Sequence, residues 1–258
     1  MTFSVLSAQG ALLCAALFLT GLVDAVCGGG GLISIAALMT TGIPSHMVIG
    51  TNQTVATTGL MTSILKFRES GQIHWPVARS SAPSALVGAV LGARLNLLVP
   101  EKILQWILIL MVPVIAAVVL MNKEFGTENR IDTLSDHQIT VRAAIIGFVL
   151  GAYQGFYGAG SGTFVILAFV VFLRQDLVGA SGTAKVMLLA ALLAGAVTYI
   201  ASGNVLWNAV LPCMVFNIFG NYCGSVLAVR KGAKVIRPMF LGILLLLVVK
   251  IGADALLG

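Results

Sequence analysis

Asp24 is the one charged side chain before Lys66, and the chain up to that lysine consists mostly of long apolar runs. A helix needs about 20 apolar residues to cross a hydrocarbon core of about 30 Å, and runs of this length recur along the chain. The mean hydropathy is +1.03, and 9% of the residues are charged, whereas soluble domains have about 25%. We therefore expect an all-α fold, that of a polytopic helical membrane protein.

The chain contains two similar halves. "GLVDAVCGGGGLI" from residue 21 matches "GAYQGFYGAGSGT" from residue 151. Further along, "GTNQ" from residue 50 matches "GTAK" from residue 182, so the similar stretches follow one another in the same order in both halves. Internal similarity of this kind is typical of transporters built from two repeats. We expect a first membrane repeat over 1–121, a polar connector over 122–139 and a second membrane repeat over 140–258.

Each repeat is expected to contain about five membrane segments, the second of which is short. A short segment of about eleven residues follows the glycines in each half and measures ~17 Å as a helix. The segments predicted for the first half are 8–27, 31–42, 47–66, 77–98 and 102–121. Those predicted for the second half are 140–157, 162–173, 180–201, 207–229 and 236–255.

Equivalent loops of the two repeats show opposite charge bias: where one loop of a pair is basic, its counterpart is not. The loop 66–79 is basic and its counterpart 201–207 is uncharged, whereas 229–237 is basic and its counterpart 95–102 is nearly balanced. Positively charged loops lie on the cytoplasmic side of a membrane. We therefore expect inverted repeats, with both termini outside and the connector inside.

Glycines interrupt the apolar pattern once in each half, in "VDAVCGGGGLIS" and "YGAGSG". Glycine allows the positive φ angles of a sharp turn, and a helix starting after the turn presents free N–H groups and partial positive charge. Two such helix starts meeting at the membrane midplane would form an anion site. The substrate-binding residues predicted at these breaks are Gly28, Gly29, Gly30, Gly31, Tyr157, Gly158, Gly160, Ser161 and Gly162.

The other glycine patterns have a different interpretation. Close helix packing is the usual role of small residues spaced by four in membrane helices. We expect packing for Gly147, Gly151 and Gly155, and for the pairs Gly88/Gly92 and Gly220/Gly224.

Polar side chains inside the apolar segments extend the candidate site. Lys185 lies within the third segment of the second half, where it either provides a countercharge for an anion or extends to the membrane surface. Asp24 either takes part in coupling or braces the glycine turn, since an intramembrane carboxylate is costly without a role. The substrate-binding residues predicted here are Thr51, Asn52, Gln53, Thr183 and Lys185.

No pattern of a catalytic site occurs in the sequence. HExxH, GxSxG and P-loop motifs are absent, as is a pair of carboxylates within one span. We expect no enzyme activity, no metal or cofactor, and no nucleic-acid partner. The expected partners are a small anionic substrate and the lipid bilayer, and a homodimer remains open.

The residues resemble one known family. The stretch from "GLVDAVCGGGGLIS" to "GTNQ", together with "GAVLGARL", "GFYGAGSGTF" and "GNVLW", is similar to the sulfite exporter family of the TauE/SafE type, also called toluene-sulfonate uptake permeases. The family commonly has Lys after its GTN element, where this chain has Gln53. The resemblance implies a permease of the bacterial inner membrane that moves sulfite, an organosulfonate or a related sulfur-containing anion.

The resulting expectation is a secondary transporter for a small sulfur-containing anion, with alternating access around a midplane anion site. Two alternatives stay open at this point. One is a passive anion channel, and the other is a membrane accessory protein that does not transport.

Overall fold

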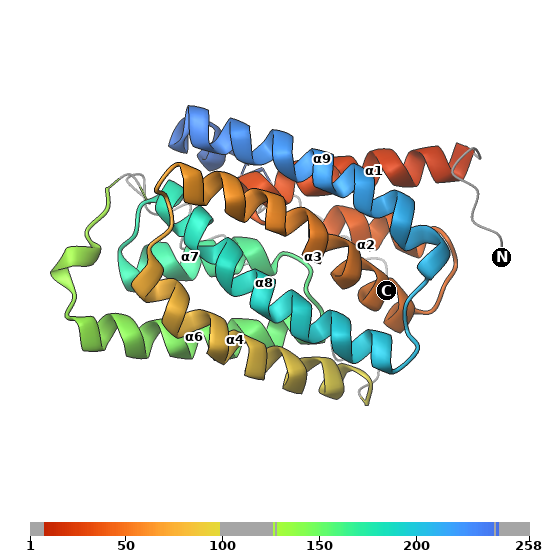
Figure 1. Ribbon diagram of the computed structural model, residues 1–258, viewed down its shortest axis with the longest axis horizontal. Coiled ribbons are helices and arrows are strands. Elements are labelled where there is room, and N and C mark those ends of the chain that lie inside the picture. The colour runs from red at the N-terminus through yellow and green to blue at the C-terminus, as the bar shows by residue number, and fades with distance from the viewer. Residues whose placement is uncertain (1–7, 99–125, 127, 240, 243–258) are drawn as a thin grey trace, which may run out of the picture.

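The computed structural model of the chain describes residues 8–98, 126, 128–239 and 241–242 (Figure 1). These residues form helices joined by short turns, with no strand among them, which confirms the all-helical fold. The helices are α1 (Ala8–Cys27), α2 (Gly31–Met39), α3 (Ser45–Glu69), α4 (Trp75–Asn96), α6 (Asp136–Phe156), α7 (Ser161–Leu173), α8 (Leu177–Ala201) and α9 (Trp207–Lys231), with a 3-10 turn at Ile131–Thr133 before α6.

Four of these helices are long and apolar enough to cross a membrane: α1, α6, α8 and α9. Large apolar side chains also project outward from them, for example Leu12, Ile145, Val197 and Leu211, the last of which is 70% exposed. Extensive apolar surface of this kind is unfavourable in water and normal in lipid. The prediction that the chain is a membrane protein is therefore confirmed.

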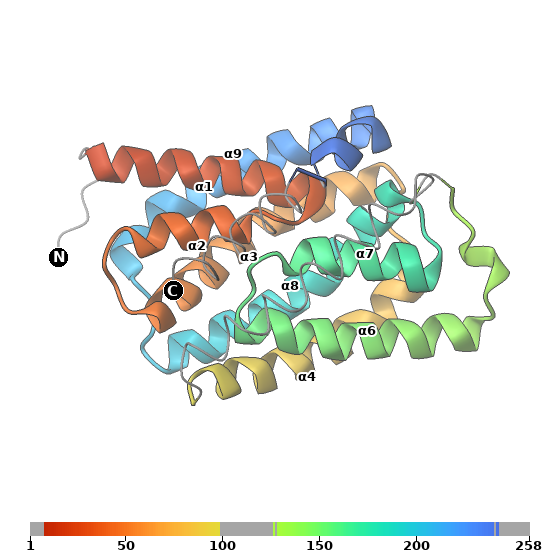
Figure 2. The ribbon, with the colours of Figure 1, turned by 180° about the vertical axis from the view of Figure 1, so that it is seen from behind.

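Two helical hairpins enter the bundle from opposite ends, as Figure 2 shows. One consists of α1 and α2 and the other of α6 and α7, and their tips overlap near the middle. The second arms are short, since α2 has 9 residues and α7 has 13. These lengths correspond to about 14 and 20 Å of helix, so each second arm returns toward the end from which its hairpin entered. The inversion of the halves relative to a membrane stays a prediction.

The helices group into two bundles that exchange one helix. Helix α9 packs on α1 and α3 of the first half, and α4 packs on α6 and α8 of the second half. We call α1, α2, α3 and α9 the first bundle, and α4, α6, α7 and α8 the second bundle. Helices α4 and α9 occupy equivalent places in the two repeats. Each of them packs on the first and third helices of the other repeat, so the two sets of contacts are equivalent.

The glycine patterns of α4, α6 and α9 serve close packing, as predicted. A Cβ on Gly151 of α6 would lie 2.5 Å from the Cα of Ala85 in α4. A Cβ on Gly224 of α9 would lie 2.9 Å from the Cα of Leu22 in α1. The exchanged helices thus approach their partners at backbone distance, which only glycine permits at these positions.

Some predicted boundaries were wrong by a few residues. Helix α6 begins at Asp136 rather than 140, because Ser135 and Gln138 form a capping box inside the predicted connector. Helix α2 ends at Met39 rather than 42, before a turn at Gly42 with φ +71°. The predicted segment 102–121 and most of 236–255 lie outside the described residues.

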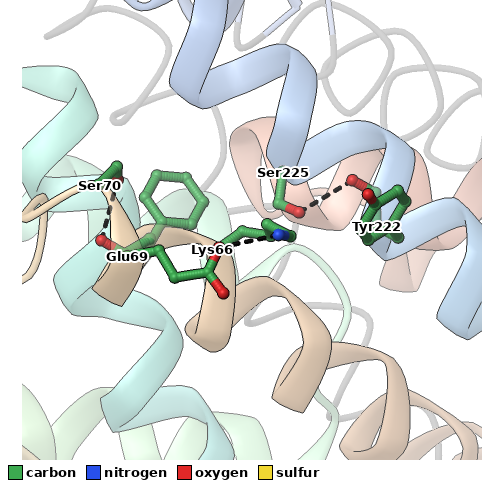
Figure 3. A network of polar contacts seen from close by, with 6 residues as sticks. Lys66, Glu69, Ser70, Tyr222 and Ser225 are labelled. Carbon is green, nitrogen blue, oxygen red and sulfur yellow. Dashed lines mark hydrogen bonds and ion pairs between the residues drawn. The ribbon is translucent and has the colours of Figure 1, made fainter.

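A basic side chain near the end of α3 contacts both a carboxylate and an aromatic ring. Lys66 forms an ion pair of 2.8 Å with Glu69, and its Nζ lies 5.5 Å from the centre of the Tyr222 ring in α9 (Figure 3). A cation over an aromatic face is stabilising. This contact joins the last turn of α3 to α9 within the first bundle.

Candidate functional site

Both predicted helix breaks are present. Helix α1 ends at Cys27, and Gly28 turns the chain with φ +79° before α2 begins. Helix α6 ends at Phe156, and Gly158, the repeat mate of Gly28, turns the chain with φ +80°. By repeat mate we mean the residue at the equivalent position of the other half. A positive φ is readily adopted by glycine alone, so each turn depends on a glycine at this position.

The two breaks lie in contact with each other. A Cβ on Gly28 would lie 2.6 Å from the Cα of Gly162, at the start of α7. A Cβ on Gly31, at the start of α2, would lie 3.4 Å from the carbonyl oxygen of Gly158. The N-termini of α2 and α7 therefore converge at one place between the bundles.

A polar side chain braces each turn from the last turn of the preceding helix. The Oδ1 atom of Asp24 accepts a hydrogen bond of 2.7 Å from the backbone N–H of Gly30. In the other half, Ser161 Oγ donates to the Oε1 atom of Gln154, the repeat mate of Asp24. The backbone N–H groups at a helix N-terminus need acceptors, and Asp24 supplies one to the start of α2. The bracing role weighed for Asp24 is thus observed, and its coupling role stays a prediction.

The carbonyl groups at the broken end of α1 are satisfied by the second half. Thr163 Oγ1 donates to the carbonyl of Cys27 at 3.0 Å, and Ser181 Oγ donates to the carbonyl of Val26 at 3.2 Å. The Nζ of Lys185 donates to the carbonyl of Asp24. Unpaired carbonyls at membrane depth cost several kcal/mol each, which explains why these three donors cluster around the break.

The broken end of α6 is held in the equivalent way. Gln53, the repeat mate of Lys185, donates from Nε2 to the carbonyls of Gln154 at 3.2 Å and Gly155 at 3.3 Å. A long side chain of α3 or α8 therefore binds the last turn of the opposite half's broken helix. One of these two side chains is charged and the other is neutral.

A small cavity lies beside the meeting point of the breaks. Its volume is about 30 Å³, which corresponds to room for roughly two water molecules. The residues that line it are Asp24, Gly28, Gly31, Asn52, Ala56, Leu60, Gln154, Gly158, Ser161, Gly162, Lys185, Leu188, Leu192 and Asn221.

The lining combines charge, an amide and apolar walls. Asp24 and Lys185 supply one charge of each sign. Asn52 is 4% exposed, and its side chain makes no hydrogen bond to the residues that the structure describes. Leu188 and Leu192 of α8 form an apolar part of the lining. Their repeat mates on α3, Ala56 and Leu60, also belong to it.

Thr51 and Thr183 lie outside this lining and hold loops instead. Thr183 Oγ1 accepts the backbone N–H of His74 at 2.9 Å, just before α4. Its repeat mate Thr51 accepts the N–H of Leu206 at 2.9 Å, just before α9. Each of these hydroxyls therefore anchors the start of an exchanged helix within its bundle.

His74 also caps α4 with its ring. Its Nδ1 accepts the N–H of Val77 at 3.4 Å, which requires the neutral ring. Partial burial lowers the pKa of His74 below its usual value of 6.5, although Asp132 acts in the opposite direction. The neutral ring is therefore the favoured form in the folded chain.

Comparison with known proteins identifies the chain's relatives. The model of the sulfite exporter TauE/SafE family matches residues 13–251. The chain belongs to this family.

Individual TauE/SafE relatives are named as transporters. The chain is 31% identical to a "probable membrane transporter protein" of Haemophilus influenzae over 222 residues, 86% of each chain. It is 31% identical to "probable membrane transporter protein YfcA" of Escherichia coli K12, over 92% of this chain and 89% of the relative. No solved structure matches the chain. This TauE/SafE member is therefore a membrane transporter of that type.

The cavity of this TauE/SafE chain includes predicted and unpredicted residues. Gly29, Gly30, Gln53, Tyr157 and Gly160 do not line it, although they belong to the breaks or to the contacts beside them. Gln154 and Asn221 line it and were not predicted. A sequence signal for Asn221 was available. Asn217 and Asn221 are spaced by four within an apolar helix, and amides in a membrane helix indicate a buried role. The described residues contain no group of three or more metal-ligating side chains.

Proposed function

We propose that this TauE/SafE member is a secondary transporter for a small sulfur-containing anion, such as sulfite or an organosulfonate. The observation that carries the proposal is the convergence of two helix N-termini on one small cavity that Lys185 also lines. Each N-terminus carries a partial charge of about +0.5, and backbone N–H groups bind oxyanions directly. The predicted substrate-binding residues that line the cavity are Gly28, Gly31, Asn52, Gly158, Ser161, Gly162 and Lys185.

The arrangement of the bundles supports alternating access. The cavity lies where α1 and α3 of the first bundle face α7 and α8 of the second. Its volume of about 30 Å³ is too small for a sulfur oxyanion of four or more heavy atoms, so binding requires the walls to separate. We infer that a movement of one bundle against the other opens the cavity to one side of the membrane at a time.

Counterflow in proteoliposomes tests the proposal. Vesicles containing the purified protein are loaded with unlabelled sulfite and diluted into a trace of labelled sulfite. A carrier accumulates the label transiently, because it exchanges one anion for another. A passive anion channel releases sulfite without saturation. With a non-transporting accessory protein, the vesicles take up no more label than protein-free vesicles do. Either of the last two results rejects the proposal.

A further inference from the structure

The charges around the cavity balance each other. Among its lining residues, Asp24 of α1 carries a negative charge and Lys185 of α8 a positive charge, and the other twelve are uncharged. Lys185 is fully buried, and its Nζ donates to the backbone carbonyl of Asp24. The carboxylate of Asp24 and the ammonium of Lys185 also interact electrostatically, so the two charges leave the lining without net charge.

The remaining attraction for an anion comes from partial charges. The N-terminus of α2 is already engaged, because Asp24 accepts the N–H of Gly30. The N-terminus of α7 lines the cavity through Ser161 and Gly162. Asn52 adds a side-chain amide that is 4% exposed and makes no hydrogen bond within the described part of the chain. Its polar atoms are not among the fully buried unpaired atoms of the described residues, so this amide can donate to a ligand in the cavity.

We propose that this cavity selects singly charged oxyanions over doubly charged ones. The inference rests on the proposed transport function and specifies its substrate class. One negative charge is met by the N-terminus of α7 and the Asn52 amide, after Asp24 has offset Lys185 and engaged the N-terminus of α2. A second negative charge would have no counterpart in a site of low dielectric, where an uncompensated charge is strongly disfavoured.

Two substitutions change the charge without removing the contacts. In D24N the amide oxygen still accepts the N–H of Gly30, and the cavity gains one unit of positive charge. In K185Q the amide replaces the ammonium, as Gln53 does at the equivalent position of the first half, where it binds backbone carbonyls. The double variant D24N/K185Q restores the balance. K66Q removes a lysine outside the cavity and serves as the control.

The experiment compares uptake of labelled methanesulfonate and sulfate into proteoliposomes. Both are tetrahedral sulfur anions, but methanesulfonate has one charge and sulfate has two. The wild-type protein and K66Q should favour methanesulfonate by at least about tenfold. D24N should reduce this preference by about tenfold, K185Q should lose about tenfold in methanesulfonate uptake, and the double variant should recover the wild-type preference.

Each result bears on one of the two proposals. Wild-type uptake of sulfate at the methanesulfonate rate, or an unchanged preference in D24N, overturns the charge selection. If the apolar walls alone favoured the methyl group, D24N would leave the preference unchanged. If D24N does not reach the membrane, K185Q provides the test instead. Unchanged methanesulfonate uptake by K185Q then overturns the inference. A wild-type protein that moves neither sulfite nor either test anion rejects the proposed function itself.

Discussion

Gly28 and Gly162 lie in backbone contact, although they belong to different halves of the sequence. A Cβ on Gly28 would lie 2.6 Å from the Cα of Gly162, and one on Gly162 would lie 2.6 Å from the Cα of Gly28. The contact joins the tip of the first hairpin to the tip of the second. It therefore determines where the N-termini of α2 and α7 meet.

Replacing Gly28 with Ala should destabilise the protein through this contact. The positive φ costs a non-glycine residue about 1–2 kcal/mol, and the overlap with Gly162 adds about 1–3 kcal/mol. Gly71→Ala is the matched control, because Gly71 has φ +70° but no atom within 4 Å of its Cβ position. Thermal unfolding in detergent should show the larger loss for Gly28→Ala. Equal losses would mean that the contact between the breaks contributes nothing.

Gly31→Ala should slow transport while preserving the fold. The new methyl group would lie 3.4 Å from the nearest atom, an ordinary contact, but at the edge of the cavity. One methyl group in a fitted pocket changes rates by roughly 10–200-fold. Initial rates of sulfite counterflow, corrected for protein in the membrane, measure the effect, and Gly31→Leu should abolish transport. Wild-type rates in Gly31→Leu would place the substrate elsewhere.

Thr183→Val should reduce stability rather than substrate binding. The substitution conserves volume but leaves the N–H of His74 without its acceptor, at a cost of about 1–3 kcal/mol. Thr58→Val is the control, because the hydroxyl of Thr58 binds only the carbonyl of Val55 in its own helix. The melting temperature in detergent should fall for Thr183→Val and remain near wild type for Thr58→Val. A change in the KM for sulfite without a change in melting temperature would instead assign Thr183 to the substrate.

His74 should make the protein less stable in mild acid. Because burial lowers its pKa in the folded state, its contribution is complete above the pKa of the unfolded chain. That contribution is lost as the pH falls through the lower pKa of the folded chain. His74→Asn caps the helix without titrating, so its melting temperature should fall less between about pH 7.5 and pH 5. The expected difference is below about 1 kcal/mol, and an identical decrease in both proteins would contradict it.

Ser70 and Ser202 should lie on opposite sides of the membrane. They are repeat mates, at the ends of α3 and α8, and the inverted orientation places Ser70 inside and Ser202 outside. Cysteines at these positions, in a chain with Cys223→Ser, are labelled in right-side-out vesicles with an impermeant maleimide. Ser202→Cys should react at once and Ser70→Cys only after permeabilisation. Reaction of both from the same side would reject the inverted repeats.

The sequence predicted the features that depend on local chemistry. The turns at Gly28 and Gly158 followed from the conformational freedom of glycine. The packing of Gly151 and Gly224 followed from the spacing of small residues along a helix. The repeat itself was visible as similarity between the two halves of the chain. Each of these inferences needed only a short stretch of chain or a comparison of two stretches.

The roles of the polar residues were harder to predict. Thr51 and Thr183 were expected at the substrate, but their hydroxyls bind the N–H groups of Leu206 and His74. Lys185 lines the cavity and also binds the broken end of α1. A polar residue in an apolar segment signals a buried partner, but the sequence does not say which partner it meets.

The sequence by itself determined that the chain forms membrane helices in two similar halves, each broken by glycines, because hydropathy and glycine flexibility act over a few residues. Only the tertiary structure decided that α4 and α9 exchange bundles, that Gly28 meets Gly162, and that Asp24, Asn52 and Lys185 share one cavity. These relationships join residues far apart in the chain. They depend on how whole helices pack, and no local pattern records which surface of a helix meets which neighbour.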